Sequence, residues 1–127
     1  MLKTVHHIAI ICSDYPTSKK FYTEILELEI IREVYREERD SYKLDLALNG
    51  QYIIELFSFP NATKRPSHPE AQGLRHLAFA VNDITDMISK LNSKGIRTEE
   101  IRIDPNTGRK FTFFSDPDDL PLELYEE

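Results

Sequence analysis

The sequence presents one order of landmarks twice, and this repeat constrains the fold more than any other feature of the chain. In each half an apolar segment leads to an aspartate, Asp14 or Asp83. In each half a histidine, His7 or His76, precedes that aspartate by seven residues. Matching landmarks at equal spacing are typical of an internal repeat. We therefore expect two copies of one supersecondary unit.

Each aspartate stands before a segment with helical periodicity. Apolar residues recur at helical spacing from Phe21 to Leu26 and from Ile84 to Leu91. Strand-like segments surround both helices, at about 5–11, 28–36, 42–48 and 52–58, and at about 74–81, 96–103, 110–115 and 120–126. Each half therefore has the order β-α-β-β-β, which predicts an α+β fold of two tandem βαβββ modules.

Turn residues mark the breaks between these segments. Asn49-Gly50 predicts a tight hairpin, and Asp116-Pro117-Asp118-Asp119 predicts a turn before the last strand. Residues from about 60 to 72 are rich in proline and polar residues, which indicates a linker. We expect a single domain, 1–127, with a first module at about 4–59 and a second at about 73–127.

Composition excludes several classes of protein. The 127 residues are 40% hydrophobic, enough for the core of one domain. Because 16 Lys and Arg stand against 22 Asp and Glu, for a net charge of -6, we expect no nucleic-acid partner. No apolar run is long enough to span a membrane, and the single Cys12 cannot form an internal disulfide. These features favour a cytoplasmic protein with no membrane partner.

Strand alternation separates the two neighbouring histidines of the first half. His7 should share a face with Ala9 and Ile11, whereas His6 should point to the opposite face and be structural. In the second half, His76 lies in register with the small residues Ala78 and Ala80, which leave room for a cleft.

A carboxylate lies within the last apolar strand of each half. Glu55 follows Ile54 and precedes Leu56, and Glu123 lies between Leu122 and Leu124. A glutamate in such a strand is seldom buried unless it is paired, protonated or bound to a metal. Taken singly, a strand glutamate is more often a solvated residue and a strand histidine a structural one.

The spacing of the repeat links each glutamate to a histidine. His7 precedes Glu55 by 48 residues and His76 precedes Glu123 by 47, so each half supplies one imidazole and one carboxylate. Pseudo-symmetric pairing of the halves would bring these four side chains together on a concave sheet face. Two nitrogen and two oxygen donors suit one divalent ion such as Ni, Co, Zn or Mn.

At these residues the sequence resembles the vicinal oxygen chelate superfamily, and within it the glyoxalase-I-like proteins. The resemblance covers essentially the whole chain. It rests on six segments: Val5-His6-His7-Ile8-Ala9-Ile10, Phe21-Tyr22, Tyr52-Ile53-Ile54-Glu55-Leu56, Arg75-His76-Leu77-Ala78-Phe79, Phe113-Phe114-Ser115-Asp116-Pro117-Asp118, and Leu122-Glu123-Leu124.

The resemblance implies a fold of paired βαβββ modules around a metal cleft, with His7, Glu55, His76 and Glu123 as metal ligands. In such enzymes the metal holds adjacent substrate oxygens and stabilises an enediolate, while a glutamate moves a proton between neighbouring carbons. By this analogy Glu123 is the first candidate for the catalytic base and Glu55 the second. The residues themselves do not separate the two.

Two departures from the family pattern bear on the substrate and on a turn. Ile11 stands where relatives that use glutathione carry an arginine, so we expect a substrate other than the glutathione hemithioacetal. Asp119 replaces the glycine common in this turn, and aspartate tolerates the left-handed conformation better than most residues.

Several basic and aromatic residues could line or rim the cleft. They are Arg32, Arg36, Arg39, Arg109, Lys110, Tyr42, Phe57, Phe111 and Phe113. Arg75 should point away from His76 by alternation, and His68 lies in the linker, which could close over the cleft.

The leading hypothesis is a metal-dependent lyase or isomerase that acts on a small molecule. An extradiol-type dioxygenase or a thiol transferase is the second hypothesis, but Glu55 would be a fourth protein ligand where these keep three. A metal-free module that binds a drug or metabolite is the third, and a purely structural protein the fourth. We expect a homodimer, with the halves pairing either within a chain or between chains.

Overall fold

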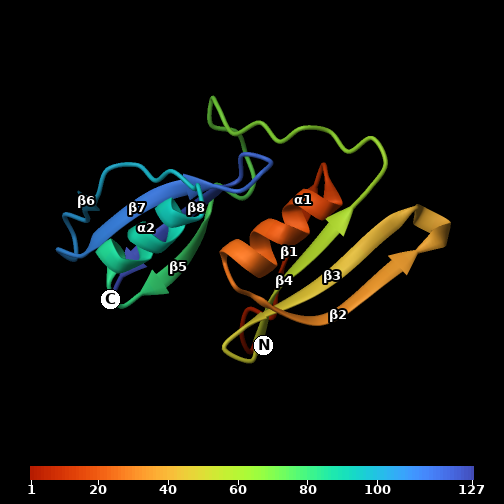
Figure 1. Cartoon of the computed structure of the whole chain (residues 1–127), viewed down its shortest axis with the longest axis horizontal. Coiled ribbons are helices and arrows are strands. Elements are labelled where there is room, and N and C mark those ends of the chain that lie inside the picture. The colour runs from red at the N-terminus through yellow and green to blue at the C-terminus, as the bar shows by residue number, and fades with distance from the viewer. The chain divides into compact units, whose positions relative to one another are not determined.

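A computed structural model describes all residues from Met1 to Glu127. The chain divides into two compact units, Met1–Lys64 and Arg65–Glu127, and each is described by itself (Figure 1). Each unit contains one four-stranded sheet with its own helix.

The first unit has the predicted β-α-β-β-β order. Its elements are β1 (Ile8–Cys12), α1 (Tyr15–Lys20) continued by a π-helical turn (Phe21–Ile25), β2 (Glu29–Arg36), a 3₁₀ turn (Glu37–Arg39), β3 (Ser41–Leu48) and β4 (Gln51–Ser58). The sheet order is β1-β4-β3-β2, in which β1 is parallel to β4 and the other pairs are antiparallel. Asn49 and Gly50 have positive φ, as the predicted hairpin turn requires.

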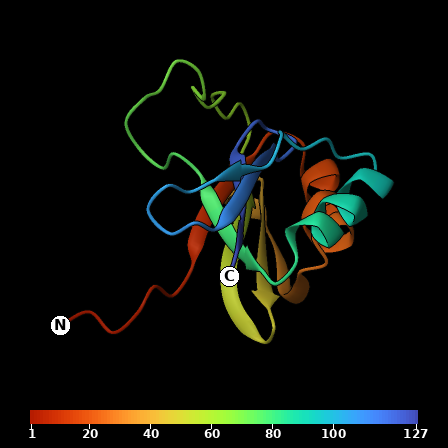
Figure 2. The same ribbon diagram turned by 90° about the vertical axis from the view of Figure 1, so that its left-hand side faces the viewer.

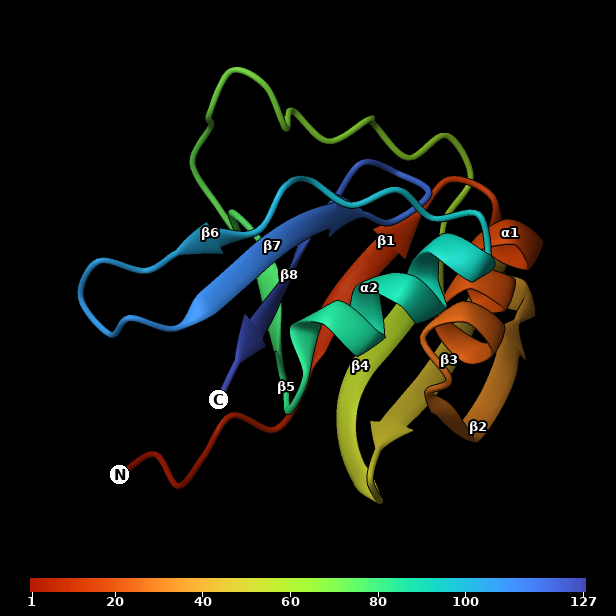
Figure 3. The same ribbon diagram turned by 60° about the vertical axis from the view of Figure 1, so that its left-hand side comes forward.

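The second unit repeats this topology. Its elements are β5 (Leu77–Val81), α2 (Ile84–Ser93), β6 (Arg102–Ile103), β7 (Lys110–Ser115) and β8 (Pro121–Glu126), which Figure 3 separates well. The sheet order β5-β8-β7-β6 matches that of the first unit, with β5 parallel to β8. The predicted α+β class with two βαβββ modules is thus confirmed.

The two aspartates of the sequence repeat cap the two helices. Asp14 accepts a hydrogen bond from the Thr17 backbone N–H at 3.1 Å, and Asp83 accepts one from the Asp86 N–H at 3.0 Å. Each cap satisfies a backbone donor that the first helical turn leaves free. The equal His-to-Asp spacing is therefore explained by the same strand-to-helix connection, which is present in both units.

Burial alternates along the strands that carry the two glutamates. Ile54 and Leu56 of β4 are fully buried, on the face on which α1 packs. Leu122 and Leu124 of β8 are buried in the same way in the unit that contains α2. Because neighbouring side chains of a strand point to opposite faces, each glutamate lies on the face away from the helix.

Three strands are shorter than expected. β1 begins at Ile8 and β5 at Leu77, so the histidines lie just before their strands, and Figure 2 shows the chain before β1 as an extended tail. β6 contains only Arg102 and Ile103 because only these two residues pair with β7. Neither helix has the length and hydropathy of a membrane span.

Candidate metal centre

The first unit brings together one histidine and one glutamate. His7 Nε2 lies 3.7 Å from Glu55 Oε1, with 34% of the histidine side chain and 16% of the glutamate side chain exposed. Glu55 occupies the centre of its strand and pairs with Ala9 of β1, whose small side chain leaves the space beside it open. This His7–Glu55 pair is the first half-site.

The second unit contains the equivalent pair in the equivalent place. His76 Nε2 lies 3.3 Å from Glu123 Oε1, and 29% and 14% of the two side chains are exposed. Glu123 pairs with Ala78 of β5, as Glu55 pairs with Ala9. This His76–Glu123 pair is the second half-site.

The chemistry and spacing of each half-site fit a divalent ion. Two ligands held at about 2.1 Å from one ion, with an angle of 90–110° between them, lie about 3.0–3.4 Å apart. The measured separations of 3.7 and 3.3 Å come close to this range without rearrangement of the backbone. Neither unit by itself holds a group of three or more His, Cys, Asp or Glu side chains that could bind a metal. Each unit thus offers two ligands.

His6 does not point away from His7, contrary to the prediction from strand alternation. Their Nδ1 atoms lie 2.8 Å apart, and their rings meet edge to face at 5.0 Å. Alternation does not apply because the strand begins only at Ile8. This contact occupies Nδ1 of His7 and leaves its Nε2 facing Glu55.

A polar network surrounds Glu55. The Tyr52 hydroxyl donates to Glu55 Oε2 at 3.2 Å, and Lys43 Nζ lies 3.4 Å from the same oxygen. The Tyr52 ring also stacks on His7, with centroids 5.0 Å apart. Tyr52 therefore contacts both members of the first half-site.

A buried aspartate anchors this network. Asp45 is fully buried and accepts hydrogen bonds from Lys43 at 2.7 Å, from Tyr52 at 2.8 Å and from Arg32 at 2.8 Å. Burial alone would raise the pKa of Asp45, but these hydrogen bonds outweigh it and hold the pKa below its usual value. Burial and the hydrogen bond to Asp45 raise the pKa of Tyr52, so the hydroxyl keeps its proton and donates it.

The surroundings of Glu123 are apolar instead. Phe113 of β7 lies opposite Glu123 in the sheet register, and its ring meets the His76 ring edge to face at 5.1 Å. Arg102 lies over the rings of Phe111 and Phe113, at 5.1 and 5.3 Å from their centroids. Beyond His76, Glu123 has no hydrogen-bonding or ionic partner in the chain.

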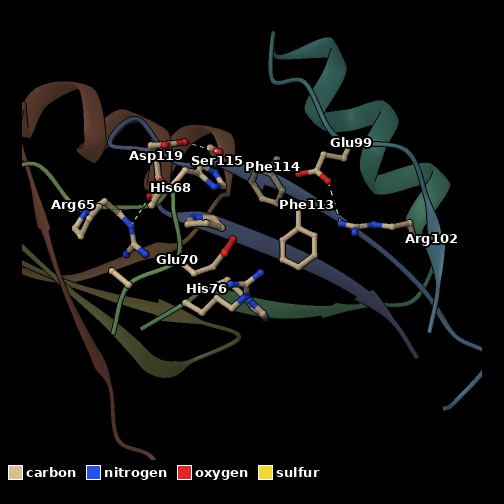
Figure 4. A pocket seen from close by; sticks show the side chains of 15 residues that line it. Arg65, His68, Glu70, His76, Glu99, Arg102, Phe113, Phe114, Ser115 and Asp119 are labelled. Carbon is tan, nitrogen blue, oxygen red and sulfur yellow. Dashed lines mark hydrogen bonds and ion pairs between the residues drawn. The ribbon is translucent and has the colours of Figure 1, made fainter. Parts of the chain in front are cut away.

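A cavity of about 320 Å³ lies beside the second half-site. His76 and Phe113 line it together with residues 65–71, the segment expected to be part of a linker (Figure 4). Arg65 donates to the Leu74 carbonyl at 3.0 Å and Ser67 donates to the Asp119 carbonyl at 2.6 Å, which holds this segment in place.

Charged side chains from several segments reach the same cavity. Figure 4 shows the Glu70 carboxylate turned toward the space between His76 and Phe113. Arg75 also lines the cavity, contrary to the prediction from alternation, because it precedes β5. Arg75 forms no ion pair or hydrogen bond within the chain, so its guanidinium is available to an anionic ligand.

The other rim candidates are distributed differently. Arg32 binds Asp45, and Arg36 lies over the Phe57 ring at 4.9 Å. Tyr42 stacks on Tyr15 of α1, on the face of the sheet away from Glu55. Arg109 and Lys110 do not line the cavity. Sequence reasoning missed the roles of Asp45, Lys43, Tyr52 and Arg102.

Known proteins resemble this chain along its whole length. Residues 4–124 match the family model described as Glyoxalase/Bleomycin resistance protein/Dioxygenase superfamily. The uncharacterized protein YwkD of Bacillus subtilis is 62% identical over 127 residues, which cover 100% of this chain and 99% of that protein. The crystal structure of a glyoxalase family protein from Enterococcus faecalis is 52% identical, with a TM-score of 0.91 and 98% of each chain covered.

A more distant relative has a stated activity. The lactoylglutathione lyase of Schizosaccharomyces pombe is 24% identical over 144 residues, which cover 97% of this chain and 47% of that protein. This similarity links the chain distantly to glyoxalase I.

Proposed function

The chain belongs to the glyoxalase/bleomycin resistance protein/dioxygenase superfamily, and we propose that it is a divalent-metal-dependent lyase or isomerase of the glyoxalase I type. Many members of this superfamily are enzymes, and members commonly bind a divalent metal and a small molecule. The observation that carries the proposal is the repeated histidine–glutamate pair, with N–O separations of 3.7 and 3.3 Å at equivalent positions of two modules.

In this proposal His7, Glu55, His76 and Glu123 are the ligands of one Ni, Co, Zn or Mn ion. Each half-site supplies two donors, and two donors leave most of the coordination of such an ion unfilled. The proposal therefore requires both half-sites for tight binding, within one chain or between the two copies of a homodimer. It treats residues 1–127 as one functional domain of a cytoplasmic protein.

A bound divalent ion would supply Lewis-acid stabilisation of negative charge on two adjacent oxygens of the substrate. Glu123 is the proposed catalytic base, because one of its oxygens lies near His76 and the other has no partner. This free oxygen takes the proton from a carbon next to a carbonyl and returns it to the neighbouring carbon. Phe113, which lies opposite Glu123 in the sheet, shields the carboxylate from water. Glu55 is the second candidate for the base.

The cavity beside His76 is the proposed substrate site. Its aromatic wall at Phe113 suits an apolar portion of a small molecule, and the unpaired Arg75 suits an anionic group. Ile11 is 55% exposed on the first unit and offers no charge to a glutathione carboxylate. We propose, on this basis, a small substrate that is not specifically a glutathione adduct.

A panel of hemithioacetals tests the proposed reaction. The protein is stripped with a chelator, reloaded separately with Ni, Co, Zn or Mn, and assayed with methylglyoxal adducts of glutathione and of smaller thiols. We expect isomerisation that depends on added metal and favours a thiol other than glutathione. Strong turnover with glutathione would contradict only the substrate assignment, whereas no turnover with any adduct or metal would contradict the reaction class.

The alternative functions predict other outcomes in the same preparation. A dioxygenase would consume oxygen with a catechol when loaded with iron, and a thiol transferase would consume a thiol together with an epoxide. A metal-free binding module would bind a drug or metabolite equally well after chelation. Each of these results would count against the proposed lyase or isomerase.

A further inference from the structure

The two half-sites contain the same ligand types but hold their glutamates differently. Glu55 Oε1 faces His7, while Glu55 Oε2 accepts a hydrogen bond from Tyr52 and lies 3.4 Å from Lys43 Nζ. Glu123 Oε1 faces His76, and its second oxygen has no partner in the chain. One carboxylate is thus fixed at both oxygens and the other at only one.

The residues that lie opposite the two glutamates in the sheets account for this difference. Asp45 lies opposite Glu55, and Phe113 occupies the equivalent position opposite Glu123. Lys43 lies opposite Phe57, two residues after Glu55, and Phe111 lies opposite Tyr125, two residues after Glu123. The first module therefore carries a charged pair where the second carries two aromatic rings.

Tyr52 completes the contrast. It lies opposite Ala47 of β3, and the equivalent pair of the second module is Ser115 with Pro121, which has no polar group on its side chain. The polar set Lys43, Asp45 and Tyr52 thus corresponds to the apolar set Phe111, Phe113 and Pro121. We call the polar set the anchor network.

The anchor network is rigid because its centre is buried. A fully buried carboxylate such as Asp45 is stable only when it is paired, and its partners are Lys43, Tyr52 and Arg32. Tyr52 stacks on His7, and its single hydroxyl proton is shared between Asp45 Oδ1 at 2.8 Å and Glu55 Oε2 at 3.2 Å. Its position is fixed before any ligand arrives.

We propose that Tyr52, held by the buried Asp45, is a positioning residue that presents Glu55 Oε1 and His7 Nε2 as ligands of the metal centre. This inference rests on the proposed function. Residues around metal ligands that orient them contribute about 10- to 100-fold to metal affinity.

Tyr52→Phe is the variant that tests the inference most cleanly. It removes the hydroxyl but keeps the ring that stacks on His7, and it changes no charge. A change at Lys43 would be ambiguous, because it also removes a positive charge 3.4 Å from a metal ligand. Tyr42→Phe is the matched control, since it removes a tyrosine hydroxyl from the other face of the same sheet, where Tyr42 stacks on Tyr15.

The measurement is calorimetric titration of the chelator-stripped full chain with Ni or Zn, together with the visible spectrum of the Co-loaded protein. We expect Tyr52→Phe to weaken metal binding by about 10-fold or more and to change the Co spectrum. Asp45→Asn should weaken binding in the same direction. The melting temperature of metal-free Tyr52→Phe should stay close to that of the wild type, and Tyr42→Phe should bind metal normally.

Two results separate failure of this inference from failure of the proposed function. If the wild type binds metal tightly and Tyr52→Phe binds it within 2-fold with an unchanged Co spectrum, the positioning role is wrong and the metal site stands. If the wild type binds no metal, the proposed function and the inference fail together.

Discussion

Glu55 lies directly opposite the fully buried Asp45 in the antiparallel register of β4 and β3. The equivalent neighbour of Glu123 in the second module is an aromatic ring, Phe113. The two modules share their topology, their helix caps and one histidine–glutamate pair each, so the repeat preserves the residues that form a half-site. The residues around the two glutamates differ, and the different roles proposed for Glu55 and Glu123 rest on this difference.

The two glutamates should respond differently to the same substitution. Glu123→Gln should lower kcat by about 10²- to 10⁴-fold because it removes the proposed base. Glu55→Gln should act mainly through metal affinity, so excess metal should restore much of its activity. Steady-state kinetics across a metal titration distinguishes the two, with the exposed Glu100→Gln as control. Equal kcat losses at saturating metal would show that the assignment of the base is wrong.

Arg75 should determine the preference for anionic substrates. Arg75→Ala removes the unpaired guanidinium in the cavity and should raise KM for an anionic substrate about 10-fold, with little change in metal affinity. A neutral analogue should lose far less. Arg109→Ala is the control, because Arg109 lies outside the cavity. If both variants raise KM equally, general surface charge explains the effect.

The buried strand residues that hold Glu55 in place should dominate the stability of their unit. Leu56→Ala removes a fully buried side chain and should lower the free energy of unfolding by about 2–4 kcal/mol. Leu48→Ala, at a site that is 37% exposed, should cost under about 1 kcal/mol. Denaturant unfolding of both variants compares them, and similar losses would argue against the core assigned here.

Glu33 should make the free energy of unfolding depend on pH, whether or not a metal is bound. Hydrogen bonds from Lys19 and Tyr15 lower the pKa of Glu33, which joins β2 to α1. The folded state favours the charged form of this carboxylate. Its contribution to the free energy of unfolding is therefore complete above the ordinary pKa of about 4.3, and it is lost as the pH falls through the lowered pKa of Glu33 in the folded protein. Glu33→Gln should therefore be less stable than the wild type at pH 7, with a difference that shrinks in acid. Glu38→Gln serves as an exposed control, and a difference that stays constant down to pH 3 would contradict this account.

The sequence predicted the modules well because their signals are local. Periodicity and the caps at Asp14 and Asp83 placed the helices, and Asn49-Gly50 placed a hairpin. The strand starts were less accurate, so alternation misplaced His6 and Arg75, which lie before their strands. Alternation describes side chains only where strand pairing holds the backbone extended.

Asp45 shows what sequence reasoning overlooked. It lies between Leu44 and Leu46 in an apolar strand, the same signal that identified Glu55, and it is more deeply buried. The cavity wall at residues 65–71 gave no such signal, because its placement depends on hydrogen bonds to Leu74 and Asp119 rather than on local propensity.

The number of metal ions that the chain binds tests the central claim most directly. Calorimetric titration of the metal-free protein should give one tightly bound divalent ion per chain, and either His7→Ala or His76→Ala should abolish that binding. This result follows if the two half-sites bind one ion together. Two ions per chain, with each substitution removing only one of them, would contradict the account, as would a wild-type protein that binds no ion.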